Sequence, residues 1–129
     1  MKNRFFKATV AFLFTIAISF GMFANQAWAG DFSGSCSDSY VSGAILSSTC
    51  KNNQGGTNPT EIDLNLYIGN VNGKLVWQKE NFIATCSSTQ LVGSSVLVAQ
   101  CEGPGGKVPA QINLDERIGD NNGYLTYGF

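Results

Sequence analysis

The sequence predicts a small all-β protein built from two tandem copies of one unit. Three observations support this prediction. First, segments recur after about 50 residues, so that residues 32–81 align with residues 82–129. Second, apolar and polar residues alternate with a period of two, as in half-buried strands. Third, the four cysteines are divided evenly between the two copies.

Residues 1–29 are predicted to be a secretory signal peptide and not part of the fold. An apolar run over residues 10–24 precedes Ala27-Trp28-Ala29, which fits a small-x-small cleavage site. The basic residues before this run are Lys2, Arg4 and Lys7. The run is too short for a membrane span, although an uncleaved anchor is the alternative. Cleavage would leave residues 30–129 as one small domain in the periplasm or outside the cell.

The charge of this mature part narrows the choice of partner. It carries five basic and nine acidic residues, a net charge of −4. Nucleic acids and anionic membranes both select clustered Lys and Arg, which this segment lacks. We therefore expect no nucleic-acid partner, and no membrane partner once the signal peptide is removed.

The cysteines predict disulfides because an even number occurs in an exported chain. Three pairings are possible. The repeat favours one bridge in each copy, Cys36 with Cys50 and Cys86 with Cys101. A metal site is not expected, since the chain has no histidine and no C-x-x-C spacing. No cofactor is predicted.

Each copy is predicted to contain three or four short strands and no long helix. Alternating strands are expected at residues 62–67, 75–78, 112–115 and 125–128, and buried strands at 44–46 and 96–98. Asn72-Gly73 and Asn122-Gly123 predict type I′ hairpin turns, which need positive φ at both positions. Residues 79–81 form a short connection between the copies.

Catalysis has few candidate residues. Without histidine, Ser-His and Cys-His pairs are excluded. Asp115 and Glu116 are adjacent, but neighbours on a strand point to opposite faces, so solvated surface carboxylates are the expected interpretation. The protein is predicted not to be an enzyme.

Its loops are rich in Asn, Ser, Thr, Gln and Asp, which suit a ligand made of hydroxyl groups, although Asn and Gly also serve turns for backbone reasons.

Several segments at matching separations resemble the cyanovirin-N family of mannose-binding lectins. The resemblance covers residues 32–127 and includes the cysteine spacing and the tandem copies. The matching segments are Leu46-Ser47-Ser48-Thr49-Cys50, Ile62-Asp63-Leu64-Asn65, Asn70-Val71-Asn72-Gly73, Trp77-Gln78, Asn81-Phe82-Ile83, Thr89-Gln90-Leu91-Val92-Gly93-Ser94-Ser95 and Ile112-Asn113-Leu114-Asp115.

The resemblance implies a pseudo-symmetric fold of two lobes in which the repeats exchange strands. One lobe would use residues 30–66 and 117–129, and the other residues 67–116. Each lobe would carry one shallow, metal-independent sugar site. The ligand implied is α1→2-linked mannose at the tips of high-mannose oligosaccharides or glycoproteins.

The favoured site implied by the resemblance lies in the lobe that contains both chain ends. Its residues are Asp31, Gly34, Ser35, Lys51, Asn53, Asp120, Asn121, Asn122 and Gly123. The family pattern has a lysine near the start and a glutamate after the second cysteine. Asp31 and Lys51 exchange those charges, and the polar character of the site is retained.

The second implied site is expected to bind the family ligand less well. Its residues are Gly69, Asn70, Asn72, Glu80, Asn81, Ala84, Thr85, Glu102, Gly103, Pro104 and Gly106. The family has a sugar-accepting glutamate where Gly69 stands and an arginine that closes over the ligand where Pro104 stands. Both functional groups are lost, and the adjoining loop is one residue shorter.

Trp77 is expected in the core and not as a sugar platform, and Phe32 and Phe82 are expected to pack equivalently. The family's swapping hinge contains Pro where this chain has Lys79, so we expect a monomer, with a domain-swapped dimer as the alternative. The alternative functions are an envelope-associated interaction protein without mannose specificity and a small secreted glycoside hydrolase.

Overall fold

The computed structural model describes residues 30–128. The predicted signal peptide, residues 1–29, lies outside this range, as does Phe129. Within residues 30–128, no helix is long and apolar enough to cross a membrane.

Both repeats form the same series of elements. The first contains η4 (Phe32–Gly34), β1 (Cys36–Ser42), β2 (Ile45–Lys51), β3 (Thr57–Asp63), η5 (Leu64–Leu66), β4 (Ile68–Val71) and β5 (Lys74–Trp77). The second contains η6 (Phe82–Ala84), β6 (Cys86–Val92), β7 (Val96–Gly103), β8 (Gly106–Asn113), η7 (Leu114–Glu116), β9 (Ile118–Asn121) and β10 (Tyr124–Tyr127). The all-β prediction is confirmed. The expected three or four strands per copy are too few, because β1 is largely polar and β4 is short, and neither shows apolar alternation.

Two predicted strands end earlier than the alternation indicates. β3 ends at Asp63 and β8 ends at Asn113, and a 3₁₀ turn follows each. Asp63 Oδ1 accepts a hydrogen bond from the N–H of Asn65, and Asn113 Oδ1 accepts one from Asp115, both at 3.0 Å. These caps favour a helical turn over further strand. The prediction of strand beyond these caps is wrong, and Leu66 is 60% exposed.

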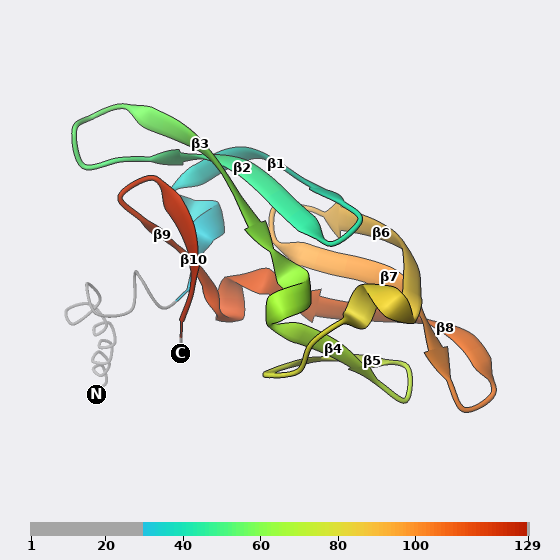
Figure 1. Ribbon diagram of the computed structural model, residues 1–129. Coiled ribbons are helices and arrows are strands. Elements are labelled where there is room, and N and C mark those ends of the chain that lie inside the picture. Colours follow the sequence, from blue (N-terminus) through green and yellow to red (C-terminus); the bar gives the residue numbers. More distant parts are fainter. Residues whose placement is uncertain (1–29, 129) are drawn as a thin grey trace, which may run out of the picture.

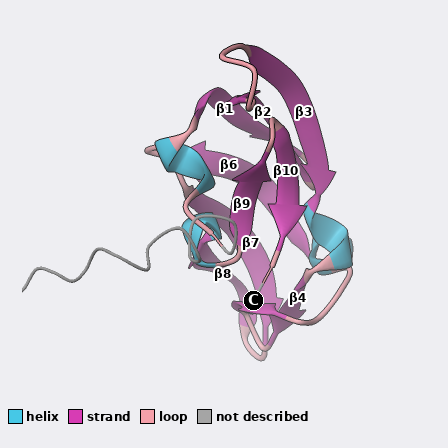
Figure 2. Cartoon of the chain, turned by 90° about the vertical axis from the view of Figure 1, so that its left-hand side faces the viewer, coloured by secondary structure: helices cyan, strands magenta, loops and turns pink. Residues whose placement is uncertain are grey.

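The two repeats exchange hairpins. β1, β2 and β3 form one antiparallel sheet, and the β9–β10 hairpin of the second repeat packs beside it, with β10 next to β3 (Figure 1). Figure 2 shows the same placement from the side. In the other lobe, the β4–β5 hairpin packs beside the sheet of β6, β7 and β8, with β5 next to β8. The predicted strand-exchanged, two-lobed fold is confirmed.

Each exchanged hairpin turns at an Asn-Gly pair, as predicted. The φ angles are 55° and 90° for Asn72 and Gly73, and 54° and 91° for Asn122 and Gly123. Positive φ at both positions gives the turn the twist of the flanking strands. The second turn, at Asn122-Gly123, lies against the loop between β2 and β3.

The core is continuous through both lobes. Phe32 and Phe82 begin equivalent 3₁₀ turns and are fully buried, as expected. The other large side chains that are fully buried are Leu46, Leu64, Ile68, Leu97, Leu114 and Ile118. Both repeats contribute to this core, so neither lobe can form from one repeat alone.

The disulfides join the first two strands of each sheet. Cys36 pairs with Cys50 and Cys86 with Cys101, which confirms the predicted pairing. The bridges connect residues 14 and 15 positions apart. In the chain-entropy model each bridge contributes roughly 3 kcal/mol by restricting the unfolded chain.

Trp77 is only partly buried, and it packs on the core without being enclosed by it. Its ring lies 5.8 Å from that of Tyr127, its equivalent in the other repeat, and Tyr127 stacks on Tyr67 at 4.3 Å. The Trp77 indole N–H donates to Glu116 Oε1 at 2.9 Å. The expected core role is therefore confirmed only in part, because Trp77 packs against the core and is not enclosed by it.

Candidate functional site

Three distant segments meet at one end of the first lobe. They are the residues around η4, the loop between β2 and β3, and the β9–β10 turn. The N–H of Lys51 donates to the carbonyl of Ser35 at 2.9 Å. The N–H of Asn53 donates to Asn122 Oδ1 at 2.8 Å. The structure thus brings together the segments that carry the favoured site predicted from the sequence.

Gly123 lets the β9–β10 turn lie directly on the β2–β3 loop. A Cβ at this position would stand 2.9 Å from Asn58 Cβ and 3.2 Å from Asn52 Cβ. The Asn58 side-chain amide also donates to the carbonyl of Gly123 at 2.8 Å. Any larger residue would separate the turn from the loop and would be strained at the positive φ.

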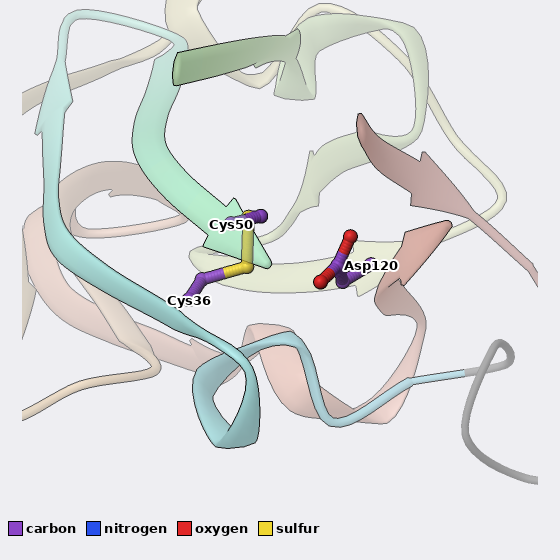
Figure 3. A group of neighbouring side chains, drawn as sticks. All are labelled: Cys36, Cys50 and Asp120. Atoms are coloured by element: carbon purple, nitrogen blue, oxygen red, sulfur yellow. A yellow bond between two sulfur atoms is a disulfide. The ribbon is translucent and has the colours of Figure 1, made fainter. Parts of the chain in front are cut away.

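Asp120 lies at the centre of this junction. Its Oδ1 accepts a hydrogen bond from the N–H of Gly123 at 2.7 Å. Figure 3 shows the carboxylate beside the disulfide of Cys36 and Cys50, whose sulfur atoms lie within 4.8 Å of a carboxylate oxygen. Because both sulfurs are bonded to each other, they offer no thiolate to a metal ion. The group is therefore an acceptor for hydrogen bonds and not a metal centre.

The exposed rim of the site combines acceptors and donors. Asp31, Lys51 and Asn53 are exposed, and Asp120 is half-buried. The N–H of Asp31 donates to the carbonyl of Asp115 at 2.9 Å, which holds Asp31 beside η7. Carboxylate oxygens, amides and an ammonium group on neighbouring segments are the groups that bind a ligand with several hydroxyl groups. Asn121 and Gly34 are also exposed at this end.

The equivalent position in the second lobe is chemically different. Asn70 replaces Asp120, and its amide nitrogen donates to Thr85 Oγ1 at 2.9 Å and to the carbonyl of Glu102 at 3.0 Å. Its Oδ1 accepts from the N–H of Gly73 at 2.8 Å. The Asn70 side chain is thus largely used within the protein. The Asp120 side chain has two acceptor oxygens and no N–H, so it cannot make these donated bonds, and its second oxygen can accept from a ligand.

The loop that borders the second predicted site is tighter. Gly103 pairs directly with Gly106, which leaves Pro104 and Gly105 as the turn. A Cβ on Gly103 would meet the carbonyl oxygen of Asn72 at 3.3 Å. In the first lobe, residues 52–56 separate β2 from β3 and form the loop that contacts the β9–β10 turn. Among the described residues of the second lobe, the shorter β7–β8 turn has no such loop.

Gly69 is buried against the connection between the repeats. A Cβ would stand 2.4 Å from Lys79 Cβ and 3.1 Å from the backbone N and O of Glu80. Asn81 and Ala84 lie exposed at the two ends of η6, joined by a hydrogen bond from the Ala84 N–H to the Asn81 carbonyl. The second group of predicted residues is therefore assembled, but without space for a side chain at Gly69.

Two residues that brace the first site were not predicted from the sequence. Asn52 Oδ1 accepts from the N–H groups of Gln54 and Gly56, which closes the β2–β3 loop. Asn58 holds the carbonyl of Gly123. The dense run of Asn and Gly over residues 52–58 was a signal for local turns. Its contact with the far end of the chain depends on the exchange of hairpins.

Comparison with known proteins gives a family match over most of the chain. The CVNH domain family matches residues 32–126. A solved structure of GzCVNH from Gibberella zeae is 34% identical, with a TM-score of 0.68, and the match covers 74% of this chain and 95% of that one. A complex of microvirin with mannobiose is also 34% identical, with a TM-score of 0.66 and coverage of 77% and 99%. A MoCVNH3 variant in complex with (N-GlcNAc)4 is 28% identical, with a TM-score of 0.74 and coverage of 78% and 98%.

Proposed function

The chain belongs to the CVNH domain family of lectins, and from this premise we propose that it binds α1→2-linked mannose at the ends of high-mannose glycans. Carbohydrate binding is the general function that the family and its sugar complexes support. The finer proposal draws on the 34% identity to microvirin, whose structure contains mannobiose. Binding would need neither metal nor catalysis.

The junction in the first lobe is the observation that carries this proposal. There Asp120 Oδ1 accepts from the N–H of Gly123, and its other oxygen can accept from a ligand. The β2–β3 loop, which carries the exposed Lys51 and Asn53, is held against the β9–β10 turn by the Asn53–Asn122 bond. A disaccharide presents several hydroxyl groups to such a site. The second lobe, with Asn70 internally bonded and Gly69 blocked, is proposed to bind weakly.

Export is part of the proposal. Residues 1–29 act as a signal peptide, and the mature protein is a monomer in the periplasm or outside the cell. The two disulfides support this location, because such bonds persist in oxidising compartments. Intact mass of the exported protein checks it, with an N-terminus at Gly30 and both bridges oxidised as the expected result.

A titration of the mature protein with Manα1→2Man tests the ligand. Backbone amide shifts by NMR are expected at Lys51, Asn53 and residues 120–123, with little change at Asn70 and Thr85. Methyl α-glucoside serves as the control sugar. An unchanged spectrum at millimolar Manα1→2Man would exclude the mannose proposal.

The MoCVNH3 complex suggests one alternative ligand. That protein was solved with (N-GlcNAc)4. The same titration with (N-GlcNAc)4 separates the two candidates, because a response at residues 120–123 to this sugar and not to Manα1→2Man would assign the site to N-acetylglucosamine.

A further inference from the structure

Apart from the two loop sites, a groove lies on the outer face of the sheet formed by β1, β2 and β3. The groove has a volume of ≈ 560 Å³, within the range of ligand sites. The residues that line it are Asp38, Tyr40, Ser47, Ser48, Thr49, Pro59, Thr60, Glu61 and Tyr124. None of them belongs to either predicted loop site.

Two exposed tyrosines border this groove. Tyr40 of β1 is 58% exposed and Tyr124 of β10 is 59% exposed. Tyr124 lies on the β3 side, since the N–H of the following Leu125 donates to Thr60 Oγ1 at 3.2 Å. Large exposed aromatic rings offer an apolar face with a polar tip, which suits rings that are apolar on one face and hydroxylated at the edge.

The strand register aligns polar groups between the tyrosines. Tyr40 pairs with Ser47, and Ser47 pairs with Glu61, so these three residues form one row across the sheet. Ser47 Oγ lies 3.4 Å from Glu61 Oε2 and donates a long hydrogen bond to it. The other Glu61 oxygen is open to a ligand hydroxyl.

A β-bulge adds a second carboxylate to the groove. The β1–β2 register shifts between Ser37 and Tyr40, and Asp38 lies there with φ of 55°. A bulge redirects the side chain of its extra residue. The lining therefore contains two carboxylates, Asp38 and Glu61, and no basic side chain. This charge disfavours phosphate, sulfate and uronic acids.

The second lobe contains an equivalent groove that lacks the two tyrosines and the two carboxylates. That groove has a volume of ≈ 460 Å³ and is lined by Ser88, Gln90, Val98, Ala99, Gln100, Pro109, Ala110 and Gln111. In the repeat alignment Gln90 replaces Tyr40, Gln111 replaces Glu61 and Ser88 replaces Asp38, while Lys74 stands where Tyr124 does. Since the second lobe folds with Gln, Ser and Lys at these positions, the fold does not require the tyrosines or the carboxylates.

We propose that the groove between Tyr40 and Tyr124 is a separate carbohydrate-binding surface for neutral oligosaccharides. The tyrosine rings stack on the pyranose rings, and Asp38 and Glu61 accept hydrogen bonds from sugar hydroxyls. This surface does not depend on the mannose site, although Tyr124 directly follows Gly123 in the chain.

NMR titrations with α-mannotriose, maltohexaose and (N-GlcNAc)4, each used alone, test the proposal. At least one of these probes is expected to shift the amides of Tyr40, Ser47, Thr49 and Glu61. In Tyr40→Gln or Glu61→Gln, which copy the second lobe, affinity for that probe should fall roughly threefold to tenfold. Gln90→Ala, in the other groove, is the matched control and should change nothing.

Three outcomes would overturn the proposal. One is the absence of groove shifts with all three probes at about 10 mM, a concentration at which a ligand with a Kd of about 1 mM is mostly bound. Another is unaltered affinity in both variants while their spectra show an intact fold. The third is stronger binding of a glucosamine tetramer with free ammonium groups, which would assign the carboxylates to a cationic ligand. Shifts of Lys51 and Asn53 with Manα1→2Man report the loop site independently in every variant.

Discussion

Asn122 Oδ1 accepts a hydrogen bond at 2.8 Å from the backbone N–H of Asn53, a residue 69 positions earlier in the chain. The bond joins the turn of the exchanged β9–β10 hairpin to the loop between β2 and β3. The proposed sugar site thus depends on a contact between the two repeats. This contact can be removed without touching the core.

Asn122→Ala should weaken Manα1→2Man binding. The substitution removes the acceptor for Asn53 and frees the loop, so we expect a loss of affinity of roughly tenfold and a loss of about 1 kcal/mol in the free energy of unfolding. Calorimetric titration and urea denaturation measure the two quantities.

Asn72→Ala is the matched control, because Asn72 occupies the same turn position with φ of 55°. Both substitutions place Ala in the left-handed region and share that strain. Only Asn122→Ala also loses the bond to a partner loop. Equal effects of the two variants on sugar affinity would contradict the role given to the Asn53–Asn122 bond.

Asp120→Asn should abolish much of the sugar affinity and leave stability almost unchanged. The new amide would be placed as Asn70 is in the second lobe, where it donates to Thr85 and to the carbonyl of Glu102. In the first lobe the Ser35 hydroxyl and the Lys51 backbone carbonyl occupy the equivalent positions and would accept in the same way. The site would then satisfy its own hydrogen bonds instead of those of a ligand. If the variant, titrated with Manα1→2Man, bound the sugar as tightly as the parent protein, Asp120 would not contact the sugar.

The reciprocal Asn70→Asp should destabilise the protein. It removes both donated hydrogen bonds and places a carboxylate against the Glu102 carbonyl. We expect a loss of about 1–3 kcal/mol in the free energy of unfolding, measured by urea denaturation with Trp77 fluorescence. A stability equal to the parent protein would show that these two bonds contribute nothing net.

Much of the fold was predictable because its signals are local. The Asn-Gly pairs fix the two exchanged hairpins, and the repeat fixes the cysteine pairing. The ends of β3 and β8 were missed, since the side chains of Asp63 and Asn113 cap a turn where the apolar pattern indicates a strand. Local capping overrides alternation at these positions.

The site was less predictable because its contacts are long-range. The family resemblance supplied the segments, but the bracing roles of Asn52 and Asn58 arise only when the last hairpin reaches the β2–β3 loop. The groove on the outer face of the β1–β3 sheet was missed for a related reason. Tyr40 and Tyr124 are far apart in the sequence, and only the packing of β10 beside β3 places them at one groove.

Asp115 joins the two repeats, and its removal should destabilise the fold. Its carboxylate accepts hydrogen bonds from the N–H and the hydroxyl of Ser33. The side-chain Oδ1 of Asn65, the equivalent residue, accepts a single hydrogen bond, from the N–H of Ile83 at 3.0 Å. Asp115→Ala leaves the Ser33 groups without this partner and should cost about 2–3 kcal/mol.

Asp115→Asn distinguishes this role from a general effect of the position. It retains the acceptor that Asn65 uses and should cost less than about 1 kcal/mol. Urea denaturation at neutral pH measures both variants. Losses of equal size for Asp115→Ala and Asp115→Asn would show that the charge, and not the hydrogen-bond geometry, holds η4 to η7.

Gly69 should tolerate no side chain, so the second site cannot be restored by one substitution. Lys79 Cβ, fixed by its backbone, would lie 2.4 Å from the new Cβ, and overpacking of this kind costs about 1–3 kcal/mol. Gly69→Ala should therefore lower the midpoint of thermal unfolding, whereas Gly34→Ala, which meets nothing within 4 Å, should leave it nearly unchanged. Gly69→Glu should be destabilised as well and gain no affinity at Asn70 and Thr85 in the Manα1→2Man titration. A stable Gly69→Glu protein with new shifts at those residues would show that the Lys79–Glu80 connection moves aside and that the second site is only one residue from binding.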